Sequence, residues 1–566
     1  MAFQFCFSRR YAGSSELECV KAWVKKVGIE RTREVFERRW KGAVREEEWV
    51  WLRDVARVTT IRLPIDYFTL GPQFCKSTPF EGYWGVYFNA WAFIKEFVSK
   101  ARSFGIGVLI YLHALPGGAN KEEPSGTNST RAELWGNRKY LGLARDAVLF
   151  IARQIAIEEL EGVVGIQLCN EAVWDALGMY RWYDDVIDAV SEVDPTIPLY
   201  ISDAWDLCRA IDYARRKNNV DLGSGNSGNP IIVDTHVYFC FSEADSTETA
   251  GRIIQGLPKQ LAELEGKDGD VTGKGAVGVV VGEWSCTLAL ATWIKSGAAE
   301  AKRREMTKEF GRAQCERWEE KAAGSFFWTL KVDWMDGGDW GFIEQTKSGG
   351  IVASKHLIMG SSEIRAVVTR TQDQKDTLRQ RCYSDHIMYW DNAAPLDPFE
   401  HWTYAQGWDV GWGDATAFFK MRQDNSIGGG DRIGCLDLWV RKRLEESGMV
   451  GKFVWEFEGG LRKGISCFWD VVGVGVDGEI YRSFADRDED GPAYNLPHPL
   501  QTFQQENGAT KRIASKSNTG RPSEKGKAYC SSGDGDEKCS DEDWVPQEDC
   551  ECSAKDDLPT RACRVG

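Results

Sequence analysis

The sequence predicts an α/β fold of the (β/α)8 barrel class, followed by a small helical region. Apolar runs rich in β-branched residues recur along the chain and are separated by segments with helical periodicity. The runs are continuous rather than alternating, which is typical of parallel strands buried on both faces. Several end in a charged or polar residue, as strands do where they reach the carboxyl-terminal rim of such a barrel.

The clearest strand lies in mid-chain, where residues 162–175 read GVVGIQLCNEAVWD. Its apolar run ends in Asn170 and Glu171, where a buried strand would enter a loop. A second stretch of the same design, GVVVGEWS from residue 278, has Glu283 in the matching position. Seven such runs alternate with helical patterns, as a βα barrel requires. We assign strands to residues 58–68, 107–114, 162–171, 198–205, 231–241, 277–284 and 324–332.

Closure of the barrel needs an eighth strand. The candidate is residues 2–7, which precede a region of helical pattern at residues 14–56. Without a strand there, two strand edges would be left unpaired.

Composition limits the classes of function. The formal net charge of −15 and the lack of a basic cluster argue against nucleic-acid binding, which needs a basic face. The 24 tryptophans are many, and they suit both protein cores and the flat apolar faces of sugars. The 16 cysteines lack the paired C-x2-C spacing of a zinc site.

No apolar run reaches the roughly 18 residues of a membrane span. The amino terminus, MAFQFCFSRRYAG, has neither the length nor the order of charges of a signal peptide. As written, the chain is therefore predicted to be cytoplasmic.

Three regions are expected: a barrel at residues 1–365, a helical region at 366–485 and a disordered, acidic, cysteine-containing tail at 486–566. In the helical region, YAQGWDVGW from residue 404 resembles FEGGLRKGI from residue 457. Small residues at helical spacing favour close packing of two helices as a hairpin, although a chance repetition is the alternative. The helical region is interpreted as packing against the barrel, with a partner-binding module as the second interpretation.

Polar and aromatic residues stand at the predicted strand ends, which a barrel gathers at one rim. Taken singly, each has an ordinary explanation, such as a surface ion pair or a hydrogen-bonded core histidine. Taken together, they form a candidate site. The set is Arg62, His113, Asn170, Glu171, His236, Tyr238, Glu283 and Trp328.

Two glutamates at one rim favour hydrolysis of a glycosidic bond. That reaction needs one carboxyl to protonate the leaving oxygen and a second, ionised carboxyl to act as nucleophile or base. We assign Glu171 as the acid/base and Glu283 as the nucleophile. Arg62 and Tyr238 are expected to keep Glu283 ionised.

The other residues are assigned to the substrate. Asn170 is expected to bind the 2-hydroxyl of the sugar, a contact that strengthens in the transition state. His113 and His236 are expected to bind hydroxyls or to help set protonation, and Trp328 to stack against the apolar face of the terminal sugar.

The segments that hold these residues resemble glycoside hydrolase family 5, particularly its fungal exo-β-1,3-glucanase type. They cover roughly residues 14–345 in the family's order and read TIRLPIDYF, LHALPG, GIQLCNEA, DTHVYFCF, VVVGEWS and GSFFWTLK. The resemblance implies a (β/α)8 barrel and a retaining mechanism with carboxyls about 5–5.5 Å apart. It implies no metal or cofactor. It also implies that Phe241 is one of two aromatic residues that clamp the leaving-side sugar.

The sequence departs from the family in three places. The usual Asn-Glu-Pro is Asn170-Glu171-Ala172, and Glu122 stands near the position of the second clamping aromatic. The glycine-rich first strand is not recognisable in residues 1–13. The expected activity is exo-acting hydrolysis of β-1,3-glucan. The alternatives are another β-glucan, a β-glucoside or a glycolipid as substrate, or a non-catalytic glucan-binding protein. The resemblance also implies a secreted or wall-associated protein.

Overall fold

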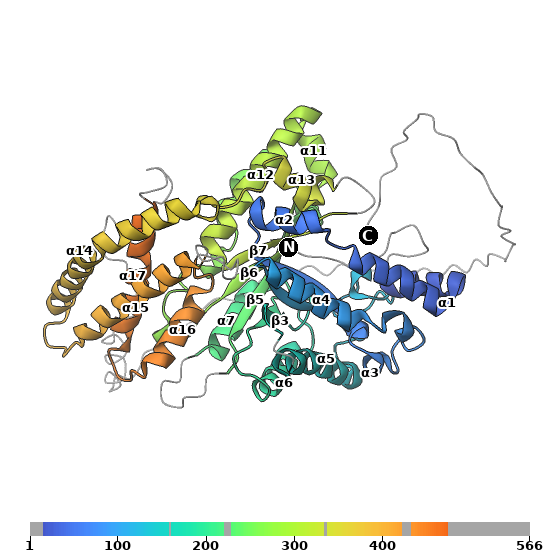
Figure 1. Cartoon of the computed structure of the whole chain (residues 1–566), viewed down its shortest axis with the longest axis horizontal. Helices are drawn as coiled ribbons and strands as arrows, with labels where there is room; N and C mark the ends of the chain where they lie inside the picture. The colour runs from blue at the N-terminus through green and yellow to red at the C-terminus, as the bar shows by residue number, and fades with distance from the viewer. Residues whose placement is uncertain (1–14, 158–159, 220–227, 333–336, 422–431, 474–566) are drawn as a thin grey trace, which may run out of the picture. The chain divides into compact units, whose positions relative to one another are not determined.

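The computed structural model describes residues 15–157, 160–219, 228–332, 337–421 and 432–473. The strand predicted at residues 2–7 and the tail predicted at residues 486–566 lie outside the described residues. The described part consists of a parallel sheet with helices around it, followed by a group of long helices (Figure 1).

Seven parallel strands form one sheet, and each strand pairs with the next along the chain. They coincide with the seven predicted runs, so the predicted barrel class is confirmed. The strands are β1 (Thr60–Asp66), β2 (Gly107–Ala114), β3 (Val163–Gln167), β4 (Leu199–Ser202), β5 (Ile231–Phe239), β6 (Val279–Leu288) and β7 (Gly324–Phe327).

Helices connect the strands and lie on both sides of them in Figure 1. Two precede the sheet, α1 (Glu16–Lys41) and α2 (Glu46–Asp54). The helices between strands are α3 (Pro72–Cys75), α4 (Ala90–Ser103), α5 (Arg138–Ile157), α6 (Met179–Ser191), α7 (Leu207–Lys217), α8 (Glu243–Thr247), α9 (Ala250–Gly256), α10 (Val271–Lys274), α11 (Leu290–Ser296) and α12 (Glu300–Lys321). After β7 come α13 (Phe342–Lys347), α14 (Ser361–Ala393), α15 (His401–Lys420), α16 (Leu436–Ser447) and α17 (Val454–Gly473).

Alternation along the strands places apolar and functional side chains on opposite faces. On β1, Ile61, Leu63 and Ile65 belong to the large hydrophobic core. Arg62 lies between two of them in the chain and contacts Glu283 on β6 instead. Asp234, His236 and Tyr238 share one face of β5 for the same reason.

The start of α16 packs against the amino-terminal ends of the sheet's last strands. Cys435 and Leu438 contact a small buried cluster that includes Ile232, Val280 and Phe326 near the beginnings of β5, β6 and β7. This is the end of the barrel opposite the strand ends that hold the candidate site. The described helical region therefore packs against the base of the barrel.

Charged side chains strengthen this contact. Asp437 accepts hydrogen bonds from the backbone N–H groups of Gly269 and Val277, and Glu458 accepts them from Val271 and Thr272 at 2.9 Å each. Arg462 pairs with both carboxylates, at 2.6 Å from Asp437 and 2.8 Å from Glu458. These groups bind the segment directly before β6, the strand that carries Glu283.

Helices α15 and α17 approach each other through glycines. A Cβ added to Gly407 would lie 2.1 Å from the carbonyl oxygen of Phe457, and one added to Gly460 would lie 2.0 Å from that of Tyr404. Gly411 and Gly464 are equally crowded by the facing backbone. The repeated sequence pattern is thus the contact surface itself. The two helices are not a simple hairpin, because α16 lies between them in the chain.

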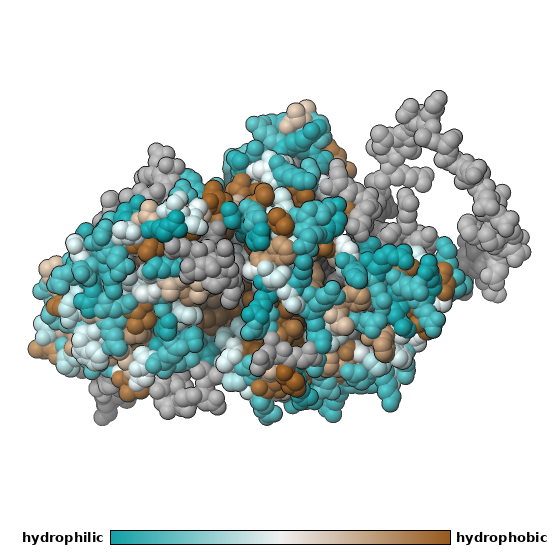
Figure 2. Space-filling model, in the orientation of Figure 1, coloured by the Kyte–Doolittle hydropathy of each residue, from teal (hydrophilic) through white to brown (hydrophobic). Residues whose placement is uncertain are grey.

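Most of the face drawn in Figure 2 is hydrophilic, with hydrophobic residues in small separate groups. Among the described residues, no helix combines the length and the apolar character that crossing a membrane requires.

The glycine contact makes a testable prediction. Gly407→Ala should lower the free energy of unfolding by about 3 kcal/mol, because the new methyl group overlaps a backbone carbonyl that cannot move alone. Gly413→Ala on the same helix meets nothing within 4 Å, so it should raise stability by about 0.5–1 kcal/mol. Urea denaturation of both variants measures the difference. Equal effects of the two substitutions would contradict the assigned contact.

Candidate active site

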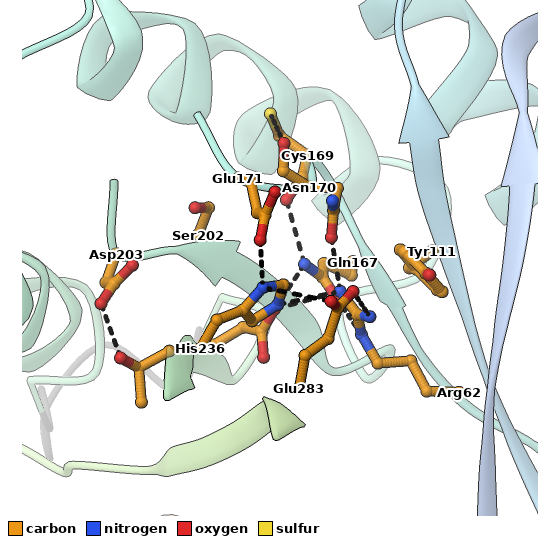
Figure 3. A network of polar contacts seen from close by, with 12 residues as sticks. Arg62, Tyr111, Gln167, Cys169, Asn170, Glu171, Ser202, Asp203, His236 and Glu283 are labelled. Atoms are coloured by element: carbon orange, nitrogen blue, oxygen red, sulfur yellow. Dashed lines mark hydrogen bonds and ion pairs between the residues drawn. The ribbon is translucent and has the colours of Figure 1, made fainter. Parts of the chain in front are cut away.

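Arg62 lies at the centre of the predicted site, fully buried on β1 (Figure 3). Its guanidinium donates to Gln167 Oε1 at 2.9 Å, to Glu283 Oε1 at 2.7 Å and to Asn170 Oδ1 at 2.7 Å. The Tyr111 ring lies under the guanidinium, 3.5 Å from its carbon. The planar fork of arginine suits this role, because it offers several donors in fixed directions.

Glu283 lies on β6 and is buried, with an exposed fraction of 5%. Its second oxygen, Oε2, accepts a hydrogen bond from the Tyr238 hydroxyl at 2.9 Å. Burial alone would raise the pKa of this carboxyl, but the charges of His236 and Arg62 outweigh it and hold the pKa below 4.5. Glu283 is therefore ionised at neutral pH, which a nucleophile requires.

His236 connects the two predicted catalytic carboxyls. Its Nδ1 lies 2.8 Å from Glu171 Oε1 and 3.6 Å from Glu283 Oε2, and its Nε2 lies 3.2 Å from Asp234 Oδ2. Burial alone would lower the pKa of this imidazole, but the charges of Glu283 and Asp234 raise it well above 6.5. A charged imidazole can donate from both nitrogens, as these contacts require.

The two carboxyls face each other across a short gap. One oxygen of Glu171, one of Glu283 and a ring nitrogen of His236 all lie within 4.8 Å of one another. Retaining glycosidases hold their carboxyls about 5–5.5 Å apart, and inverting ones about 6.5–9.5 Å apart. The separation therefore fits the retaining geometry.

Glu171 stands in the loop after β3, and its backbone has the left-handed φ of 41°. Asn120 Nδ2 donates to the Glu171 carbonyl at 2.9 Å, and the next residue, Ala172, donates its N–H to Ser202 Oγ at 3.3 Å. These contacts hold a conformation that a non-glycine residue rarely adopts, and such strain is typical of functional sites. The Glu171 side chain is the more open of the two carboxyls, at 25% exposed against 6% for Glu283.

The predicted aromatic and histidine partners also lie at this rim. His113 stacks on Trp328 with ring centroids 6.0 Å apart, and its Nδ1 lies 3.1 Å from the Tyr111 hydroxyl. Burial lowers the pKa of His113 to about 4, so this imidazole is neutral. Phe241 lies at the outer edge, 67% exposed and 5.2 Å from the Tyr238 ring.

Several residues of the site were not predicted. Gln167 and Asp234 hydrogen-bond each other at 2.6 Å beneath Arg62, and Trp340 lies beside both Tyr238 and Phe241. Asp234 had a usable signal, because it shares a strand face with His236 and Tyr238. Trp340 had none, because it ends a single 3-10 turn after β7 (Gly338–Trp340) that has no sequence periodicity.

Two exposed tryptophans follow neighbouring strands at the same rim. Trp174 lies after β3 and is 65% exposed, and Trp205 lies after β4 and is 53% exposed. An ion pair of 2.8 Å between Asp175 and Arg209 joins the loop of Trp174 to α7, the helix that follows Trp205. Trp205 has a left-handed φ of 64°, held by a hydrogen bond from its N–H to Asp203 Oδ1 at 3.1 Å. Both rings are displayed to solvent next to the loop of Glu171.

Two groups of histidine and carboxylate atoms are close enough to hold a metal ion among the described residues. One is the candidate catalytic group of Glu171, His236 and Glu283. The guanidinium of Arg62, 2.7 Å from Glu283, and the charged imidazole of His236 already supply positive charge there, which disfavours a metal ion. The other group lies in the helical region.

A parallel barrel with two facing carboxyls at its strand ends defines the active site of a glycosidase. Residues 371–472 match the family model described as the glucan 1,3-beta-glucosidase 3 C-terminal domain. The chain is 31% identical over 452 residues to glucan 1,3-beta-glucosidase 3 of Schizosaccharomyces pombe, covering 79% of this chain and 88% of that protein. It is 29% identical over 468 residues to an uncharacterized glycosyl hydrolase of Saccharomyces cerevisiae, covering 80% and 84%.

Among solved structures, rutinosidase from Aspergillus niger aligns with a TM-score of 0.45 and 20% identity, over 60% of this chain and 91% of that one. The sequence relationship to the Schizosaccharomyces pombe protein spans most of both chains. This chain belongs to glycoside hydrolase family 5, within its exo-β-1,3-glucanase type, and is a glycosidase.

The charges around His236 make a second prediction. Glu283→Gln removes the negative charge that raises the pKa of His236 most, so His236 should lose its proton at a markedly lower pH. Glu171→Gln should lower that pH less, because Glu171 contributes the smaller effect. Histidine NMR titration of the three proteins measures the order. A larger shift in Glu171→Gln would contradict it.

Proposed function

We propose that this enzyme is a retaining, exo-acting hydrolase of β-1,3-glucan, with Glu283 as nucleophile and Glu171 as general acid/base. The observation that carries the proposal is the short gap between the two carboxyls, one of which is held ionised by Arg62.

The chemistry follows from the difference between the two carboxyls. Glu283 attacks the anomeric carbon while Glu171 gives its proton to the leaving glycosidic oxygen, which forms a covalent glycosyl-enzyme. Water then enters, loses a proton to Glu171 and displaces Glu283 from the sugar. His236 Nδ1 lies beside the same Glu171 oxygen, so it orients the carboxyl during both steps.

The neighbouring side chains suit recognition of the bound sugar. Asn170 accepts from Arg62 through Oδ1, which leaves its amide N–H groups to donate to the 2-hydroxyl. Trp328, braced by His113, offers a flat face for the terminal sugar. Phe241, with Tyr238 and Trp340 behind it, offers a second apolar face on the leaving side.

The choice of β-1,3-glucan is supported by the names of the relatives, several of which are glucan 1,3-beta-glucosidases. Another β-glucan, a β-glucoside or a glycolipid would meet the same pair of carboxyls. We further propose that the barrel region extends to residue 365, in the first turns of α14, and that the helical region stabilises its base.

The catalytic roles can be separated by the choice of leaving group. Glu171→Ala should lower kcat on laminarin about 10²–10⁴-fold, because the leaving sugar oxygen needs a proton. Formation of the glycosyl-enzyme from 2,4-dinitrophenyl β-glucoside should be slowed far less, because that leaving group departs as an anion. Burst kinetics with both substrates measure the two steps.

Glu283→Gln should lose turnover of both substrates, on the order of a thousandfold or more. Product analysis by chromatography completes the test. Glucose as the first product of laminarin supports exo action, oligosaccharides from internal cleavage reject it, and preferential turnover of a different β-glucoside would reassign the substrate.

The exposed tryptophans Trp174 and Trp205 lie beside the loop of Glu171, the acid that protonates the leaving oxygen, so they should bind the leaving-side sugars rather than act on the chemistry. Trp205→Ala should raise the KM for laminarin oligosaccharides about five- to tenfold, because one sugar–aromatic contact is lost. The KM for an aryl glucoside, which has no sugar on the leaving side, should change little. Trp402→Ala is the matched control, because Trp402 is similarly exposed but lies on α15. An equal rise for both substrates would contradict a leaving-side role.

A further inference from the structure

The helical region contains a second cluster of histidine and carboxylate groups, far from the strand ends in the chain. His386 lies on α14, His401 is the first residue of α15, and Glu456 lies near the start of α17. Their candidate ligand atoms all lie within 4.8 Å of one another. Three helices thus converge on one point through groups that bind metals.

The hydrogen-bonding directions at this point call for a cation. His386 Nε2 lies 2.9 Å from Glu456 Oε2, and His401 Nδ1 lies 2.8 Å from the same oxygen. The other nitrogen of His401, Nε2, lies 3.1 Å from Asp391 Oδ1. A neutral imidazole has one N–H, so if it donates to Asp391 it turns a lone pair toward Glu456. Either an additional proton or a metal ion must then lie between His401 Nδ1 and Glu456 Oε2.

The need for a cation is stronger because the carboxylate of Glu456 is fully buried. Among the described residues, its ion pairs are with these two histidines, whereas Glu283 in the active site is paired with an arginine. Its other oxygen, Oε1, accepts the backbone N–H of Glu400 at 2.8 Å, which fixes the direction of the carboxylate. A buried carboxylate without a strong cation is costly.

We propose that His386, His401 and Glu456 bind a divalent transition-metal ion of the zinc type. Two imidazole nitrogens and one carboxylate oxygen are a recurrent ligand set for zinc, with the fourth position left to water. Asp391 supplies the carboxylate partner that metal-binding histidines usually have on their second nitrogen, and it fixes Nδ1 as the ligand atom.

The fit requires a small adjustment. Ligand atoms at 2.0–2.2 Å from a tetrahedral zinc ion lie roughly 3.3 Å apart, so the nitrogens and the oxygen must separate by about half an ångström. The side chains are otherwise held in place. His386 stacks on Tyr404 with centroids 3.9 Å apart, and His401 stacks on Phe399 at 5.2 Å. Asp391 is largely exposed, which gives the ion a route from solvent.

The test uses the full-length enzyme, stripped with a chelator, dialysed against zinc chloride in slight excess and analysed for bound metal. One zinc per chain is expected, together with a higher Tm than that of the stripped protein. Glu456→Gln and His386→Asn should retain none. Asp391→Ala should bind zinc about 10–100-fold more weakly. Glu171→Gln, which removes one member of the catalytic cluster, is the matched control and should retain the full amount.

Wild-type protein alone provides a second measurement, which does not depend on the folding of a variant. Cobalt(II) added to the stripped enzyme should give the intense visible absorption of tetrahedral coordination, and zinc should abolish it. The proposal is overturned if the stripped wild type takes up no more zinc than Glu456→Gln, or if Glu171→Gln removes the metal. If the stripped wild type takes up no more zinc than Glu456→Gln, the three residues instead form protonated hydrogen bonds that join the helices.

Discussion

The candidate active site is organised around the buried guanidinium of Arg62. Arg62 has no exposed surface, and its guanidinium contacts Glu283, Asn170, Gln167 and Asp234, which come from β6, β5 and the region of β3. An uncompensated charge at this depth would cost several kcal/mol, and its partners would be equally costly without it. The charges on opposite sides of the barrel are therefore stable only as a set. The ionisation of Glu283 and the proton on His236 are consequences of that set.

The topology of the barrel explains which residues of the site can be predicted from the sequence and which cannot. A barrel brings strand ends to one rim, so Arg62, Glu171, His236 and Glu283 were predictable from strand order alone. Strand alternation also carried a signal for Asp234, which lies two residues before His236 on β5 and so on the same face. Trp340 and Trp205 were not predictable, because a short 3-10 turn places the first and a left-handed loop the second, and no sequence period describes such connections.

The helical region shows the same contrast. The repeated glycine spacing around Gly407 and Gly460 predicted a close contact between helices, and the structure has one. The order of the helices was not predictable, because α16, which packs on both the other helices and the barrel, lies between α15 and α17 in the chain. The His386, His401 and Glu456 cluster was equally hidden, since its members lie up to 70 positions apart on three helices.

Asp437 and Glu458 accept hydrogen bonds from backbone N–H groups within residues 269–277, which fixes the path of this segment. This segment leads directly into β6, so it sets where β6 begins and therefore where Glu283 lies. Strand β6 thus runs from the segment that the long helices contact to the rim that holds Glu283. Removal of the C-terminal helices would uncover the small apolar cluster around Ile232 and Val280 and leave the segment before β6 without these hydrogen bonds, so we infer that the two regions act as one unit.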